Sequence, residues 1–206
     1  MSAFEMAALL SPLLLGIFVP LVLALGREGS WTVRRRVASL VALLLSWTLL
    51  LGVLWIASAE PFSRLAASLA FLGAWSGFLV GLFHALVGLR IPAFLAQVSC
   101  GFAVVLMVGT LFYFDPILEE AQGGPPESFQ ARIDIAMEWN PYVVMAYSIF
   151  EDDLLTHRSL YTRTLLADLP RVYPDWSRSA FRYLALAGAL SLFFLGSSFL
   201  RRRFRE

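Results

Sequence analysis

Residues 139–182 read WNPYVVMAYSIFEDDLLTHRSLYTRTLLADLPRVYPDWSRSAFR and are the only sizeable stretch of the chain that is suited to water. Within them, the apolar run 142–150 follows the helix-breaking pair Asn140-Pro141. A helix that crosses a bilayer needs roughly twenty residues, so this run is too short to span. We therefore expect it to lie at the membrane interface or to re-enter the membrane.

The second half of the same stretch leads back towards the membrane. The acidic cluster 151–153 suits the positive N-terminal end of a helix that we expect over residues 154–169,. Pro170 and Pro174 then stop that helix. Trp176 and Tyr183 come where the chain would re-enter the bilayer, and such amphipathic rings favour the headgroup level.

Long apolar segments surround this stretch and set the fold class. Hydrophobic residues make up 59% of the 206 residues, whereas soluble domains average nearer half. Five segments are long enough to span a membrane: 7–26, 37–57, 65–89, 91–114 and 181–200,. The sequence predicts an all-α integral membrane protein with five transmembrane helices and an outer helical cap between the fourth and the fifth. We expect a four-helix transmembrane region over 1–114, an extracytoplasmic helical or re-entrant segment over 115–180, and a final transmembrane helix with a basic cytoplasmic tail over 181–206.

The charged residues exclude several functions and orient the chain. The net charge is +1 and all sixteen basic residues are arginine. We therefore expect no nucleic-acid partner, and no P-loop ATPase or lysine Schiff-base chemistry within this chain. Because arginine-rich short loops stay cytoplasmic, the clusters at 27–36 and 201–205, with Arg90, place the amino terminus outside and the carboxyl terminus inside. The lysine-free composition is typical of a GC-rich bacterial genome, so we expect the bacterial cytoplasmic (inner) membrane.

Residues within the apolar segments supply two further candidate sites, one for helix packing and one for a cofactor. Gly73, Gly77 and Gly81 recur every four residues, which predicts a surface for close helix packing, within the chain or with a second copy,. His84 follows one turn later and is a candidate ligand of haem or chlorophyll. The alternative is a neutral, hydrogen-bonded histidine near the interface, and we expect no bound cofactor. No serine elbow, paired His/Cys metal motif or nucleotide fingerprint is present,, so we expect neither a metal site nor an enzyme.

The order of motifs in the last seventy or so residues resembles that of the permeases of type-2 ABC exporters. Their last outer connection carries an Asn-Pro followed by short helices that dip into the membrane, which corresponds to Asn140-Pro141 and the run to Phe150. Tyr173, Pro174 and Trp176 before the final span, and the arginine tail after it, extend the resemblance. The predicted topology is similar to five of that family's six spans, with the first span apparently lacking.

The resemblance implies a transport function and partners. It implies a permease-type subunit that moves a hydrophobic or amphiphilic substrate, driven by a separate nucleotide-binding ATPase and assembled with a second permease subunit in membrane lipid. Trp31, Arg34, Arg35 and Arg36 fall where the family contacts its ATPase, although a purely topogenic arginine cluster explains them equally well. The alternative function is a non-catalytic structural subunit of a larger membrane redox or photosynthetic complex.

Overall fold

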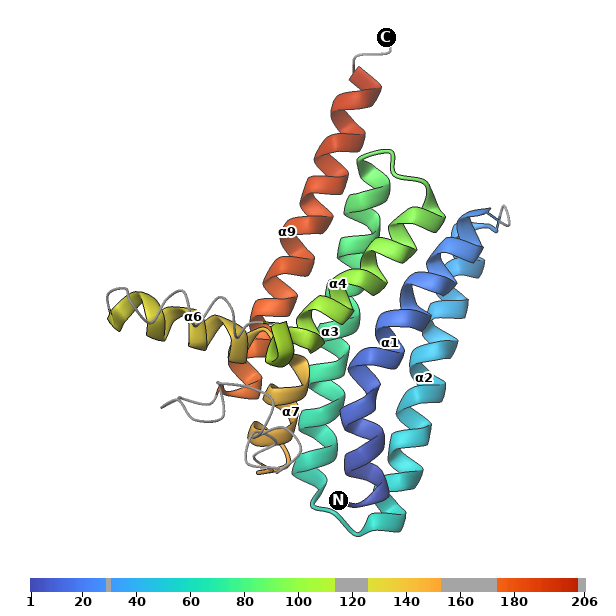
Figure 1. Cartoon of the computed structure of the whole chain (residues 1–206). Coiled ribbons are helices and arrows are strands. Elements are labelled where there is room, and N and C mark those ends of the chain that lie inside the picture. The colour runs from blue at the N-terminus through green and yellow to red at the C-terminus, as the bar shows by residue number, and fades with distance from the viewer. Residues whose placement is uncertain (29–30, 114–125, 153–173, 204–206) are drawn as a thin grey trace. The chain divides into compact units, whose positions relative to one another are not determined.

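The computed structural model describes residues 1–28, 31–113, 126–152 and 174–203. These residues form helices α1 (Ala3–Glu28), α2 (Val33–Ser58), α3 (Phe62–Gly88), α4 (Ala93–Tyr113), α6 (Pro126–Glu138), α7 (Pro141–Ser148) and α9 (Trp176–Arg203) (Figure 1). No strand occurs among them. Helices α1, α2, α3, α4 and α9 are each long and apolar enough to cross a membrane. The predicted all-α fold with five membrane-spanning helices is confirmed.

Two compact units divide the chain. Unit 1 contains Met1–Val104 and Ala180–Glu206, and unit 2 contains Val105–Ser179. Both boundaries therefore fall inside long helices, the first in α4 and the second in the opening turn of α9. The sequence placed the corresponding boundaries after residues 114 and 180.

Two indole groups join the first three helices of unit 1. The Trp75 Nε1–H of α3 donates to the Pro12 carbonyl of α1 at 3.0 Å, and the Trp47 Nε1–H of α2 donates to Ser11 Oγ at 2.8 Å. Inside a bilayer a polar group has no water to bond, so it must find a partner in the protein. The adjacent residues Ser11 and Pro12 thus supply the acceptors that hold α2 and α3 against α1.

Aromatic rings join α3 to α9 within the same unit. The Tyr183 ring meets Trp75 edge-on at 5.0 Å between centroids and lies 5.7 Å from both Phe71 and Phe78. Its side chain is buried. The expectation that Tyr183 lies at headgroup level stays a prediction, since the structure shows only that its ring packs against α3.

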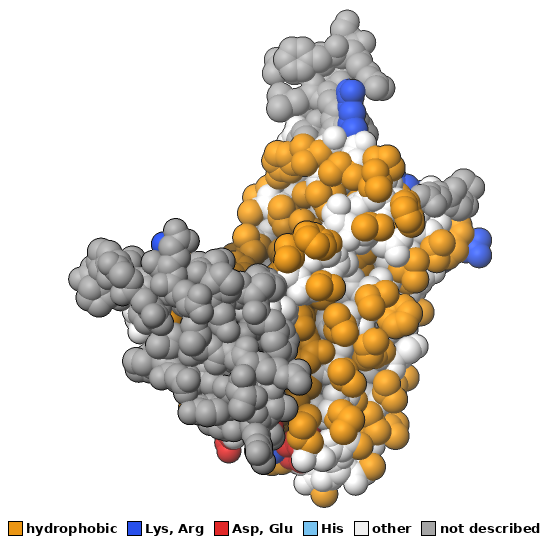
Figure 2. Space-filling view, viewed as in Figure 1, with side chains coloured by type: hydrophobic (Ala, Val, Ile, Leu, Met, Phe, Trp, Pro, Cys, Tyr) orange, Lys and Arg blue, Asp and Glu red, His pale blue; other side chains and the backbone are white. Residues whose placement is uncertain are grey.

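The surface of unit 1 is apolar over its middle, as Figure 2 shows for one face. Helix α2 contributes most to it, since only 6% of its most hydrophobic window is buried. Leu45, Leu49, Val53 and Ile56 are all exposed on this helix. Such a surface is stable only in lipid or against other membrane helices.

Unit 2 contains two short helices that lie outside the five candidate spans. Helix α6 precedes Asn140-Pro141, and its Ile133 and Met137 are buried. Helix α7 is eight residues long and buries most of its side chains, including Val143, Val144 and Met145. The predicted helix over 154–169 lies outside the described residues.

Candidate functional site

The turn between α1 and α2 holds the predicted ATPase contact, Trp31 and Arg34–Arg36. Helix α2 begins at Val33, and Thr32 caps it by accepting a hydrogen bond from the Arg35 N–H at 3.3 Å. The three arginines therefore lie in the first helical turn, whereas the sequence analysis placed them in a connection that ended at Arg36. Threonine commonly caps helix N-termini, so Thr32 was the signal in the sequence that α2 begins before Arg34.

Each of these arginines has a different environment. Arg36 is half-buried, packs its side chain over Gly26 and donates from Nε to the Trp31 carbonyl at 3.1 Å. The Arg35 guanidinium lies 4.7 Å from the centroid of the Trp31 ring in a cation–π contact,. Arg34 is exposed and is the side chain most available to a partner.

The position of the arginine cluster opposes helix stability. A helix N-terminus carries a partial positive charge, which disfavours cations in the first turn. None of Arg34, Arg35 and Arg36 pairs with an acidic side chain in the described part of the chain. Three unpaired cations at this position are therefore not explained by the needs of α2 itself.

His84 lies at the same end of unit 1, near the end of α3. Its ring is 5.8 Å from the Phe83 ring and 5.4 Å from the Phe194 ring of α9. Arg27 and Arg36 belong to the turn between α1 and α2 at this same end of unit 1 (Figure 1). The other histidine of the chain, His157, lies outside the described residues. This environment is aromatic and cationic, and nothing in it adds a second metal or haem ligand to His84.

The three glycines of α3 differ in their surroundings. A Cβ at Gly81 would lie 3.0 Å from the Ala187 carbonyl oxygen and 3.1 Å from the Ala187 Cα of α9, so any larger residue would force the two helices apart by a few tenths of an ångström. A Cβ at Gly77 would make one ordinary contact, 3.9 Å from Leu184. A Cβ at Gly73 would meet no atom within 4 Å. Among these three glycines, close helix packing is therefore confined to Gly81.

The sequence analysis missed a closer approach at Gly16 of α1. A Cβ there would lie 2.7 Å from both methyl groups of Val104 in α4. Valine is stiff at χ1 and cannot easily move aside. No second glycine lies four residues before or after Gly16 to mark it as a packing position.

The outer motif centres on Asn140, whose side chain is completely buried. Its Oδ1 accepts from the Tyr142 N–H at 2.9 Å and from the Val143 N–H at 3.2 Å, and so caps α7. Its Nδ2 donates to the Val108 carbonyl and to Thr110 Oγ1, each at 2.9 Å. Pro141 occupies the first position of α7, where its missing N–H costs nothing,. Asn140-Pro141 thus starts α7 and ties it to the end of α4 within unit 2.

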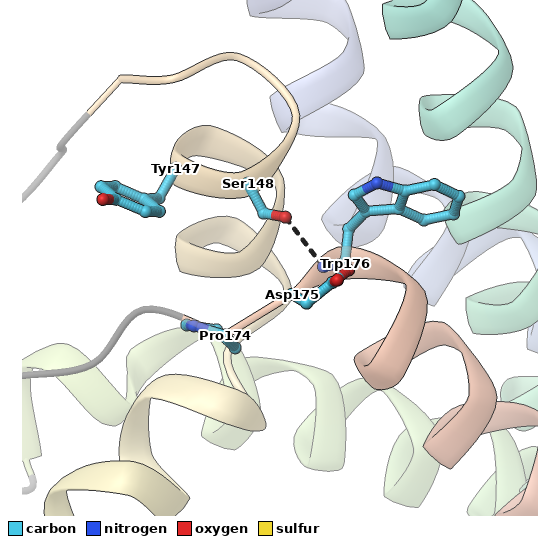
Figure 3. A pocket seen from close by; sticks show the side chains of 5 residues that line it. All are labelled: Tyr147, Ser148, Pro174, Asp175 and Trp176. Atoms are coloured by element: carbon cyan, nitrogen blue, oxygen red, sulfur yellow. Dashed lines mark hydrogen bonds between the residues drawn. The ribbon is translucent and has the colours of Figure 1, made fainter.

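A shallow pocket of about 370 Å³ adjoins α7 in unit 2 and is lined by Tyr147, Ser148, Pro174, Asp175 and Trp176. Ser148 Oγ accepts a hydrogen bond from the Trp176 N–H at 2.8 Å, which fixes the start of α9 beside α7 (Figure 3). The Tyr147 and Trp176 rings point away from one another in Figure 3. They do not form an aromatic cage. Tyr173, the remaining residue of the predicted outer motif, lies outside the described residues.

A charged cluster at the opposite end of unit 1 from Arg34 was not predicted as a site. Arg64 of α3 lies 2.8 Å from Glu60 and 3.5 Å from Glu5 of α1. Glu5 also lies 4.0 Å from the terminal amino group. The side chains of Glu5, Glu60 and Arg64 are only 15–24% exposed, and they join the first turns of α1 and α3.

No group of three or more metal-binding side chains occurs among the residues that the structure describes. The chain matches no family model, no curated protein and no solved structure.

Proposed function

We propose that this chain is the membrane-spanning, permease-type subunit of an ABC exporter, driven by a separate ATPase. The observation that carries the proposal is the outer motif: a buried Asn-Pro that starts a short apolar helix before the final span. A proline at the first helical position, preceded by an asparagine whose side chain is fully hydrogen-bonded, defines where this helix starts. The start of α9 at Trp176 adds the second element of the resemblance in the expected order.

The arginine turn is the proposed contact with the ATPase. Arg34 and Arg35 are both exposed, and the contacts of Arg35 and Arg36 with Trp31 order the turn that carries them. A preorganised cationic turn loses little side-chain entropy when it binds an acidic partner surface. The unfavourable position of three cations at the N-terminus of α2 supports a role outside the helix itself.

The orientation is part of the same proposal. Figure 1 shows the α1–α2 and α3–α4 turns at one end of unit 1 and the α2–α3 turn at the other. Arg27, Arg34–Arg36 and Arg90 all belong to the first end. By the positive-inside rule this end is cytoplasmic and the amino terminus is outside, in the inner membrane of a bacterium.

The class of substrate follows from the charges of the spans. The described Asp, Glu and Arg residues of unit 1 lie near the helix ends, and none lies in the middle of α1, α2, α3 or α4. Ion pathways place ionisable groups inside the membrane. A hydrophobic or amphiphilic substrate fits these spans better than an ion.

The contact with the ATPase is tested by co-purification. The wild-type chain, the triple variant Arg34→Ala, Arg35→Ala, Arg36→Ala and the control Arg90→Asn are each purified from their own membranes in mild detergent. Asparagine tolerates the left-handed backbone of Arg90, whose φ is 70°,. We expect a nucleotide-binding ATPase with the wild type and the control, and about tenfold less with the triple variant, because three charge-assisted contacts are lost. Equal recovery from all three would exclude the arginine turn as the contact.

A further inference from the structure

Helix α2 is the least buried of the five candidate spans and carries its charges at one end only. It lies at the edge of unit 1, beside α1 (Figure 1). Its first turn holds Arg34–Arg36, and the helix contains no acidic residue. The segment 27–36 as a whole has four arginines and one glutamate. A cationic end on a lipid-exposed helix attracts anions at the level of the headgroups.

Two of these guanidinium groups are available to such an anion. Arg34 and Arg35 are exposed, and neither pairs with an acidic side chain among the described residues. The Arg35 guanidinium lies 4.7 Å from the centroid of the Trp31 ring. A ring over the face of a guanidinium orders it without blocking the N–H groups, which point outward in its plane. Such groups bind phosphate with two parallel hydrogen bonds.

An apolar stripe continues from the arginines along the same side of α2. It consists of Val37, Val41 and Leu45, which are each about half exposed. At 3.6 residues per turn, Val41 and Leu45 lie within about 20° of Arg34 around the helix axis. At 1.5 Å per residue, Leu45 is about 16 Å from Arg34 along the helix. One leaflet has a hydrocarbon thickness of about 15 Å, half of the bilayer core, so the stripe matches the depth of one lipid.

We propose that this side of α2 binds one anionic phospholipid, whose phosphate accepts hydrogen bonds from Arg34 and Arg35. Its acyl chains lie along the apolar stripe. A zwitterionic lipid also has a phosphate, but the arginines repel its ammonium group. The site therefore selects a lipid with a net negative charge.

The same charges argue against a second copy of the chain on this side of α2. Copies inserted in the same orientation present each residue at the same depth, so a symmetric contact through α2 brings like residues together. Arg34 and Arg35 of one copy would meet those of the other, and α2 has no acidic residue to offset them. Such juxtaposed like charges oppose association.

This inference extends the proposed function by adding a lipid partner at the arginine turn, and it rests on that function only for the choice of leaflet. If this end is cytoplasmic, the lipid belongs to the inner leaflet. An ATPase approaches the turn from the water beyond the end of α2, whereas the lipid approaches from the side of the helix. Lipid binding requires no ATPase, so it is measured on the chain alone.

The experiment uses the full chain in phosphatidylcholine vesicles that contain a minor share of phosphatidylglycerol. The two probes are phosphatidylglycerol and phosphatidylcholine, each with a diazirine at the same position of one acyl chain. The variants are Arg34→Ala, Arg35→Ala and the two combined. The control Arg90→Asn also removes one exposed arginine at the same end of unit 1, but outside α2. Labelled peptides are mapped by mass spectrometry.

We expect phosphatidylglycerol to label residues 33–45 of the wild type about fivefold more than phosphatidylcholine, as about 1 kcal/mol for an arginine near an anionic headgroup implies. Each single variant should lower this ratio, and the combined variant should bring it close to one. Labelling by phosphatidylcholine should stay unchanged in all variants, which shows that α2 still reaches lipid. Arg90→Asn should match the wild type, and added inorganic phosphate should not displace the lipid probe.

Four results would overturn the proposal. The first is equal labelling of α2 by both probes in the wild type. The second is an unchanged ratio in the combined variant. The third is an equal drop for Arg90→Asn and Arg34→Ala, which shows a general attraction to this end of the unit. The fourth is displacement by inorganic phosphate, which shows that the acyl chains do not contribute. None of these results depends on whether an ATPase co-purifies with the chain.

Discussion

Asn140 alone both starts helix α7 and connects it to helix α4. Its carboxamide offers an acceptor and two donors on one side chain, and it uses them to cap α7 and to bond Val108 and Thr110. Serine or aspartate could cap a helix equally well, but neither, as the hydroxyl or the carboxylate, supplies two N–H donors. The choice of asparagine therefore follows from the double task of starting a helix and tying it to α4.

Replacement of Asn140 separates these two tasks. Asn140→Ala should destabilise the protein by about 2–3 kcal/mol, from about 1 kcal/mol for the cap and about 1 kcal/mol for each donated bond. Asn140→Ser restores the cap alone and should recover only part of this loss. Thermal unfolding in detergent, followed by limited proteolysis near α7, measures both. An Asn140→Ala melting curve identical to that of the wild type would contradict the assignment.

The glycines of α3 allow a second comparison at single residues. Gly81→Ala places a Cβ against the backbone of Ala187, which cannot rotate away, and should cost about 1–3 kcal/mol through overpacking. Gly73→Ala meets open space and should be neutral or slightly stabilising, since alanine favours the helix. Both are measured by thermal unfolding of the purified chain. Equal effects of the two changes would mean that α9 does not contact α3 at Gly81.

At the scale of elements, sequence periodicity and composition located the helices but not their contacts. The long apolar runs predicted each span because backbone groups must be satisfied internally in lipid. The side-chain patterns could not show that Tyr183 is buried against Trp75, or that Gly16 rather than Gly73 meets another helix. Those facts depend on which helices pack together, and a chain that is apolar on every face carries little information about this.

The charged cluster that joins α1 and α3 should contribute modestly. Arg64→Met removes the contacts with Glu5 and Glu60 and should lower stability by about 1 kcal/mol or less, as partly exposed ion pairs do,. Arg90→Met, at the other end of α3, is the matched control. Chemical unfolding in detergent measures the free energy of unfolding of both variants. A loss several times larger for Arg64→Met would show that these charges behave as a fully buried network.

At the scale of the whole molecule, the sidedness of the membrane spans can be tested with cysteines. The sequence has one cysteine, Cys100, which is buried, and Cys100→Ala gives a clean background. Ser63→Cys and Arg90→Cys then lie at opposite ends of α3. A maleimide that cannot cross the inner membrane should label the first in intact spheroplasts and the second only after lysis. The reverse pattern would overturn the proposed orientation.

The candidate sites could be predicted from the sequence in part. The positions of Asn140, Pro141 and Trp176 were predicted because proline and aromatic residues at span boundaries are local signals. The contacts of Arg35 and Arg36 with Trp31 could not be predicted, because they depend on how the turn folds.

Native mass spectrometry of the complex purified through this chain tests the central claim most directly. The proposed function predicts copies of this chain with a nucleotide-binding ATPase in equal numbers, in a preparation without visible absorption. A complex that contains redox or pigment-binding subunits and no ATPase would contradict it. The cap, the arginine turn and the exposed face of α2 would then be contacts within a structural assembly.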